Sequence, residues 1–208
     1  SGDFFVVNVA NSAAPSVQSK LNLHSGAKGR YVVTKGSYAF VTSSLNASGE
    51  ELFVINISDP SAPSVVAALE FGADINEISI LGTTAYLATS SDTKELILLD
   101  ITNRTSPVEI GSYNASGAAD GKSIYAKTLR RIYFGRNVSS DDELLILDAT
   151  NPSSITLRGS ISIASAIFAI MPVGTQVFLG TDDTNEEFQN FNVQNPSEIQ
   201  QLGMINLS

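Results

Sequence analysis

The chain has 208 residues, of which 43% are hydrophobic and 16% are charged, a composition that excludes a disordered protein and suits one domain with a sizeable core. Its net charge of −9 opposes nucleic-acid binding, because no basic stripe offsets the acids. No apolar run approaches the roughly 20 residues of a membrane helix, and the lack of cysteine excludes disulfides and cysteine nucleophiles.

The opening residues already carry the first copy of an apolar pattern that the chain repeats. The pattern occurs five times, as FFVVNV (4–9), LFVINI (52–57), LILLDI (96–101), LLILDA (144–149) and FQNFNV (188–193). Its penultimate polar residue, which we call the anchor, is Asn8, Asn56, Asp100, Asp148 or Asn192. Successive anchors lie 48, 44, 48 and 44 residues apart, so the spacing predicts an array of similar structural repeats.

A turn and three further strands accompany each anchor segment. The turns are rich in Asn, Asp, Ser and Pro, as in SDPSAP (58–63); Asn and Asp bond their own backbone two residues on, and Pro cannot donate to a strand ladder. A further strand follows each turn, such as VEIGSY (108–113). A hairpin of two more strands then begins the next repeat; one example is formed by INEISIL and TAYLATS around Gly82-Thr83. Each repeat therefore predicts four short antiparallel strands, with almost no helix.

The anchor strands carry apolar residues on both faces. Leu52 and Val54 point to one side of their strand, whereas Phe53 and Ile55 point to the other. Sheets that stack radially cover such strands on both sides, whereas a two-sheet sandwich predicts one apolar and one polar face. The pattern favours an all-β propeller of four-stranded antiparallel blades over a sandwich.

These segments resemble the LVIVD-repeat family of β-propeller proteins. The resemblance lies in LFVINISDPSAP (52–63), LILLDITNRTSP (96–107) and LLILDATNPSS (144–154), with support from the SYAFVTS hairpin segment (37–43). It extends over nearly the whole chain, although the first and last copies have Asn8 and Asn192 in place of Asp. The resemblance implies a bacterial or archaeal surface or secreted protein and no particular reaction.

The strand order gives a single domain with four complete blades and an N-terminal half blade. The complete blades are residues 24–71, 72–115, 116–162 and 163–208, and residues 1–23 give only the outer strands of a fifth blade. The missing inner strands either precede Ser1 or come from another molecule, or the ring closes imperfectly. We expect a longer parent chain, because a strand pattern has begun by Phe4.

Loops at one end of the blades collect charged residues and form a candidate ligand face. The blade-entry segments and the loops between second and third strands lie on this side, and they hold many of the 21 acids, including Glu51, Glu95 and Glu143. These loops either bind a partner around the axis or simply keep the blade ends hydrated and unpaired. The candidate ligand residues are Lys28, Arg30, Asp74, Glu77, Asp120, Lys122, Asp141, Asp142, Asp182 and Asp183.

No cofactor motif accompanies this face. The acidic loops offer calcium hard oxygen ligands, but they lack the spacing of an EF-type loop. Asp74 and Asp120 occupy equivalent axial positions, where paired carboxylates would suit a glycosidase. His24, the single histidine, has no nucleophile motif beside it. The hairpin tip Arg130-Arg131 lacks the glycine of its siblings and is either a solvated tip or a contact.

We therefore expect a non-enzymatic extracellular or cell-surface propeller that recognises a protein or a glycan through its loops. The alternative is a structural domain of a surface filament or surface layer, in which the chain self-associates through the incomplete blade. A glycosidase-like enzyme and a calcium-binding module are further alternatives. We expect neither nucleic-acid binding nor membrane insertion of this segment, and no cofactor.

Overall fold

The chain folds into five antiparallel sheets that follow one another in sequence. The computed structural model describes residues 4–23, 28–44 and 49–207. A two-stranded sheet, the half blade, contains β1 (Phe4–Asn8) and β2 (Ser16–Leu21). The first complete blade contains β3 (Gly29–Lys35), β4 (Tyr38–Ser43), β5 (Leu52–Asn56) and β6 (Ser64–Leu69). The second contains β7 (Ile75–Leu81), β8 (Thr84–Thr89), β9 (Leu96–Asp100) and β10 (Val108–Tyr113). The third contains β11 (Gly121–Thr128), β12 (Arg131–Arg136), β13 (Leu144–Asp148) and β14 (Thr156–Ile161). The fourth contains β15 (Ile167–Val173), β16 (Gln176–Thr181), β17 (Phe188–Asn192) and β18 (Gln200–Ile205).

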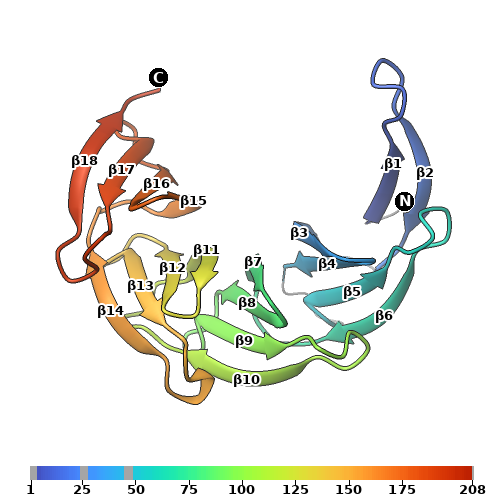
Figure 1. Cartoon of the computed structure of the whole chain (residues 1–208), viewed down its shortest axis with the longest axis horizontal. Coiled ribbons are helices and arrows are strands. Elements are labelled where there is room, and N and C mark those ends of the chain that lie inside the picture. Colours follow the sequence, from blue (N-terminus) through green and yellow to red (C-terminus); the bar gives the residue numbers. More distant parts are fainter. Residues whose placement is uncertain (1–3, 24–27, 45–48, 208) are drawn as a thin grey trace.

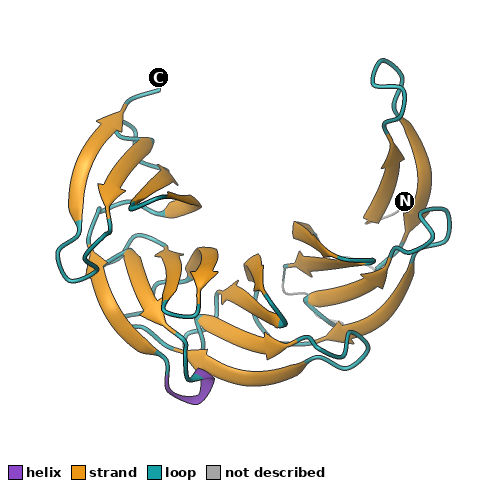
Figure 2. Cartoon of the chain, in the orientation of Figure 1, coloured by secondary structure: helices purple, strands orange, loops and turns teal. Residues whose placement is uncertain are grey.

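The sheets stand side by side around a common axis and form an open arc (Figure 1). The first strand of each complete blade lies on the inner side of the arc, and the fourth strand lies on the outer side. The short 3-10 turn η1 (Pro152–Ser154) is the one helical element that the described residues contain, as Figure 2 shows. The predicted all-β propeller of four-stranded blades is confirmed, and the sandwich alternative is wrong.

The hydrophobic cores lie between neighbouring blades. On β5, Leu52 and Val54 pack in one cluster with side chains of the second blade, whereas Phe53 and Ile55 pack in another with side chains of the half blade. These four side chains are at most 2% exposed. Full burial of one large apolar side chain contributes about 1.5–3 kcal/mol. The two-sided pattern of the anchor strands is therefore satisfied by the blades on either side.

The anchor residues end the third strand of each complete blade, and β1 of the half blade, by bonding to their own backbone. The Oδ1 atom of every anchor accepts the N–H two residues later, at distances of 2.8 to 3.0 Å. Hydrogen bonds from the hydroxyl and N–H of Thr102 lower the pKa of Asp100 below its ordinary value. The turn therefore depends on residues that are neighbours in sequence, which is why the pattern predicts it.

Candidate functional site

Direct side-chain bonds join the inner strands of neighbouring blades. The carboxylate of Glu77 on β7 accepts the N–H of Ile124 on β11 at 2.8 Å. The hydroxyl of Ser123 on β11 donates to the carbonyl of Ile167 on β15 at 2.8 Å. These bonds fix the inner strands relative to one another, so the hollow that they border is preformed.

A pocket of about 250 Å³, which we call the axial pocket, opens on these inner strands. Three of the predicted ligand residues, Arg30, Glu77 and Lys122, come together in its lining. Sequence reasoning missed the other three, and each complete blade contributes to the set. The lining residues are Arg30 and Tyr31 of β3, Asn76 and Glu77 of β7, Lys122 of β11 and Phe168 of β15.

The repeat register contains a signal for the missed residues. Arg30, Asn76, Lys122 and Phe168 are each the second residue of their inner strand. Equivalent positions in successive blades lie around the same axis, so a search for polar and aromatic residues at this position would have found the pocket.

Glu77 is the one carboxyl group in the lining of the axial pocket. Burial raises its pKa from the ordinary 4.5 to about 7, although hydrogen bonds from the Ile124 N–H and the Tyr31 hydroxyl oppose the rise. Burial and the nearby Glu77 also raise the pKa of Tyr31. Glu77 therefore gains and loses a proton near neutral pH.

The two axial aspartates are each paired with a cation of the axial pocket. Arg30 forms an ion pair with Asp74 and donates to Oδ1 of Asn76 at 2.8 Å. The Nζ atom of Lys122 lies 3.2 Å from Oδ2 of Asp120. Neither aspartate lines the axial pocket. The charge of each axial cation is therefore partly offset by its own partner.

The remaining predicted ligand residues lie outside the lining of the axial pocket. Asp182 accepts the N–H of Ala166 at 2.8 Å, and Asp183 accepts the N–H of Asn185 at 2.7 Å. The carboxylates of these loops thus hold loop backbone in place. Within residues 4–23, 28–44 and 49–207, no group of three or more acidic or histidine side chains is arranged to hold a metal ion. The residues outside the lining are Lys28, Asp74, Asp120, Asp141, Asp142, Asp182 and Asp183.

The prediction of an exposed acidic loop is wrong for three glutamates. Glu51, Glu95 and Glu143 each precede an anchor strand and are at most 1% exposed. Glu143 accepts the N–H groups of Ile163 and Ala164 at 2.9 and 3.1 Å, where the chain passes to the next blade. Glu51 accepts the equivalent N–H groups, those of Phe71 and Gly72, where the chain passes from the first complete blade to the second. These side chains join successive blades and do not face a ligand.

Two arginines also connect blades. Arg136 forms an ion pair with Glu95 at 2.9 Å, and both side chains are 1% exposed. Arg131, which the sequence leaves open as a solvated tip or a contact, donates to the carbonyl oxygens of Val193 and Gln194 at 2.5 and 2.8 Å. Arg131 is therefore a contact between the third and fourth blades. His24 lies outside the described residues.

Radial blades with an axial pocket define the class of this protein as a β-propeller scaffold. The model of the LVIVD repeat matches residues 27–69, 72–115 and 138–162, which make up more than half of the sequence. The chain belongs to the LVIVD repeat family. No curated protein matches it in sequence. Within the described part of the chain, no helix has the length and apolar character to cross a membrane.

Solved structures with the same fold are longer than this chain. A protein from Lactobacillus plantarum aligns with a TM-score of 0.78 at 15% identity, over 97% of this chain and 64% of that one. The periplasmic gluconolactonase of Pseudomonas aeruginosa aligns with a TM-score of 0.76 at 13% identity, over 98% of this chain and 63% of that one. BamB from Moraxella catarrhalis aligns at 0.62 with 15% identity, over 91% of this chain and 52% of that one. This chain thus spans less than two thirds of each, and the likeness shows the fold alone.

Proposed function

We propose that this protein is a non-enzymatic extracellular or cell-surface recognition module, and that its axial pocket binds a group presented by a glycan or a protein. The observation that carries the proposal is the convergence of side chains from four blades on one preformed pocket of about 250 Å³. Ligand pockets for larger molecules have volumes of roughly 300–1,000 Å³. The axial pocket therefore suits a single sugar ring or one polar side chain.

The chemistry of the lining fits an uncharged polar group. Tyr31 and Phe168 offer aromatic rings for the C–H face of a sugar. Asn76 and Glu77 supply polar atoms for hydroxyl or amide groups. Because Arg30 is paired with Asp74, its charge is partly offset. These features support a neutral sugar or amide over an anionic ligand.

The same lining supports binding without chemistry. Glycoside hydrolysis by the common routes needs two carboxyl groups on either side of the bond that breaks. Glu77 is the single carboxyl group lining the axial pocket. The gluconolactonase resembles this chain at 13% identity, a level at which fold does not imply activity. The extracellular or surface location rests on the LVIVD resemblance and on the periplasmic origin of that similar propeller.

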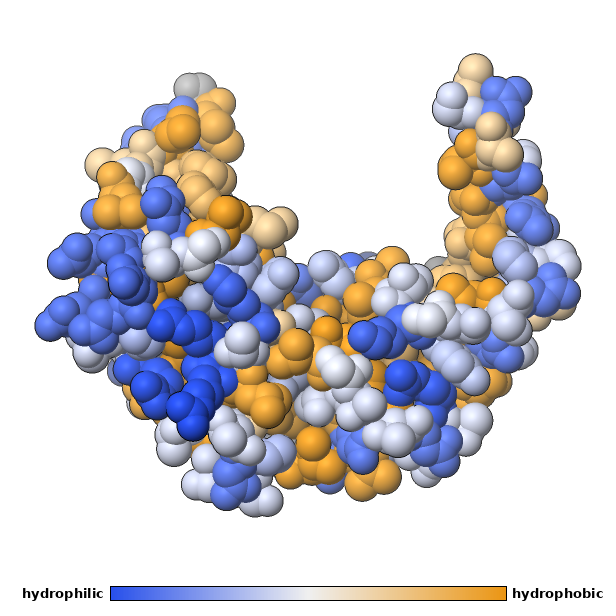
Figure 3. Space-filling model, viewed as in Figure 1, coloured by the Kyte–Doolittle hydropathy of each residue, from blue (hydrophilic) through white to orange (hydrophobic). Residues whose placement is uncertain are grey.

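Apolar side chains at the ends of the arc favour a second candidate function, a structural domain of a surface filament or layer. Figure 3 shows apolar surface at both ends. In the half blade, Phe5 is 50% exposed, and in the fourth blade Ile205 is 53% exposed. Such surfaces mark sites of association with other polypeptide.

A binding array tests the proposed function. The fluorescently labelled protein is applied to arrayed neutral and acidic glycans and to arrayed blocked peptides. We expect binding that Tyr31→Ala and Lys122→Ala weaken at least about tenfold, while Lys20→Ala, an exposed change on β2, leaves it intact. Binding that survives both axial substitutions, or release of sugar from a bound glycan, would contradict the proposal. Concentration-dependent assembly with no array binding would support the filament alternative.

A further inference from the structure

The outer strands of two interior blades carry a glycine on which the next blade rests. A Cβ atom added at Gly111 on β10 would lie 1.9 Å from the carbonyl oxygen of Pro152. A Cβ atom added at Gly159 on β14 would lie 1.6 Å from the carbonyl oxygen of Pro196. Both prolines belong to the turn that follows the anchor strand of the next blade. Glycine is therefore needed at these two contacts, whereas Ser19 of β2 and Ala67 of β6 hold the same register position in the first two sheets.

Gly203 holds the same position on β18, at the C-terminal end of the arc. Gly111, Gly159 and Gly203 each pair with the third residue of their neighbouring anchor strand, which is Asn190 for Gly203. A Cβ atom added at Gly203 would have no atom within 4 Å, and its φ is not positive. Glycine weakens a strand and often marks a close approach of another backbone. Gly203 thus fits a contact that this chain does not itself provide.

The other end of the arc is uncovered on its inner side. Ile78, Ile124 and Ile170 stand at one position of the inner strands, and each packs against the preceding blade. They are 2%, 2% and 9% exposed, whereas Val32, at the same position on β3, is 54% exposed. The half blade precedes β3 and has two strands where the other sheets have four. Val32 is therefore exposed because the half blade presents no inner strands to it.

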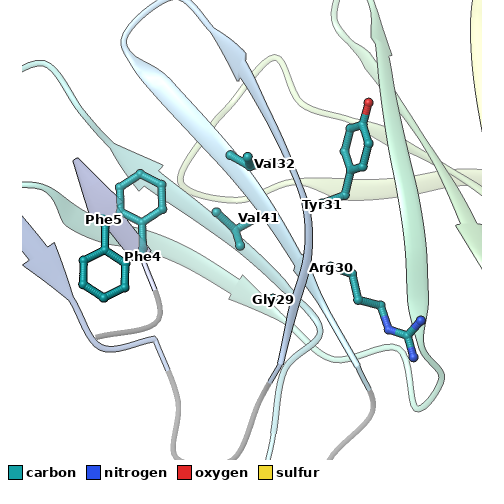
Figure 4. Close-up of a pocket in the computed structure, with 7 residues that line it drawn as sticks. All are labelled: Phe4, Phe5, Gly29, Arg30, Tyr31, Val32 and Val41. Carbon is teal, nitrogen blue, oxygen red and sulfur yellow. The ribbon is translucent and has the colours of Figure 1, made fainter. Parts of the chain in front are cut away.

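A hollow of about 340 Å³ lies between the half blade and the first complete blade, with Val32 in its lining. Figure 4 shows Phe4 and Phe5 of the half blade facing Val32 and Val41 across it, while Tyr31 points away. A second hollow, of about 250 Å³, is lined by the same two phenylalanines and Val32. Among the described strands β1 pairs with β2 alone, so its inner edge offers backbone groups to a further strand.

We propose that both ends of the arc are blade-docking surfaces, and that their occupant is further LVIVD-type repeat polypeptide joined to this chain. A further blade places its turn against Gly203, and a further inner hairpin pairs with β1 and covers Val32. The Lactobacillus plantarum propeller has about 110 residues beyond the part that this chain matches. That length suffices for two blades and a hairpin at the spacing of this repeat, 44 to 48 residues between anchors.

A second copy of this chain fits the two surfaces less well. Its half blade brings a turn, at Asn11 to Ala14, that can reach Gly203. Its described inner hairpins, however, all belong to four-stranded blades. A second copy therefore has no free hairpin for β1 or Val32, and a joined repeat segment supplies both parts.

Glycine substitutions in two chains test the proposal. One chain is residues 1–208, and the other continues after Ser208 with a copy of residues 72–181, which is two blades and an inner hairpin. Gly159→Val is the matched control and lowers the thermal midpoint of both chains by roughly 5 °C or more, because its turn is always present. We expect Gly203→Val to leave the 208-residue chain unchanged and to lower the midpoint of the extended chain as Gly159→Val does.

Hydrogen exchange gives a second measurement that does not depend on a substitution. In the extended chain, and in a chain with residues 72–94 placed before residue 1, the edge amides of β1 exchange at least about tenfold more slowly than in residues 1–208 alone. Unchanged β1 exchange in both, or a Gly203→Val variant that is neutral in the extended chain, overturns the proposal. Concentration-dependent dimers of residues 1–208 that Gly203→Val abolishes would assign the surface to a second copy and also overturn it.

Discussion

The ionisation of Glu77 makes the free energy of unfolding of this protein decrease as the pH rises. Burial raises the pKa of Glu77 from 4.5 to about 7 in the folded state. A folded pKa above the unfolded value means that the folded chain binds this proton more tightly, so the stabilisation is complete below pH 4.5 and is lost as the pH rises through 7. At about 1.4 kcal/mol per pKa unit, the ionised carboxylate costs roughly 3 kcal/mol above pH 8, most of it between about pH 5 and pH 8.

Glu77→Gln removes this titration and retains an oxygen that accepts the Ile124 N–H. We expect the free energy of unfolding of the variant, relative to the natural sequence, to rise by roughly 2–3 kcal/mol between about pH 5 and pH 8. Urea denaturation across this range measures the difference, and titrations shared by both proteins cancel. Gln18→Ala, which removes an exposed and uncharged side chain, is the control and should show a constant difference. A constant difference for Glu77→Gln as well would refute the raised pKa.

The connections between blades give two further predictions. Glu143→Ala leaves the partly buried N–H of Ile163 without its acceptor and should cost about 1–3 kcal/mol in urea unfolding. Glu198→Ala on the surface should change little, and equal effects of the two substitutions would contradict the structural role of Glu143. Glu95→Leu alone strands a buried guanidinium and should cost about 3–5 kcal/mol, and adding Arg136→Met should restore part of the loss. A double variant that is less stable than Glu95→Leu alone would show that the ion pair is not the cause.

Local pattern was enough to predict the blades. The turn after Asp100 depends on a side chain bonding its own backbone two residues on, and both bonded groups are visible in the sequence. The two-sided burial of Leu52 and Phe53 follows from alternation along one strand. Such features need no knowledge of distant residues, and the repeat presents them again and again.

Features that depend on distant backbone could not be read in this way. In the sequence, Glu143 resembles the other acidic residues of the loops. Its role depends on the N–H of Ile163, which only the folded structure brings within hydrogen-bonding distance. The proposed role of Gly203 depends on a comparison with Gly159, which lies against the turn of the next blade in the folded structure. The sequence predicts the axial pocket in part. Lys122 is predicted from its charge, whereas Phe168 is missed because equivalent positions in successive blades were compared for charged residues and not for aromatic ones.

Fragment titration followed by NMR tests the central claim, that the axial pocket is the recognition site, most directly. The labelled chain is titrated with a panel of monosaccharides and blocked amino acids while its backbone amides are assigned and followed. We expect saturable shifts that cluster on β3, β7 and β11 around Tyr31, Asn76 and Lys122, and that Lys122→Ala weakens. Shifts confined to the outer strands or loops, or no saturable shift from any fragment, would contradict the claim.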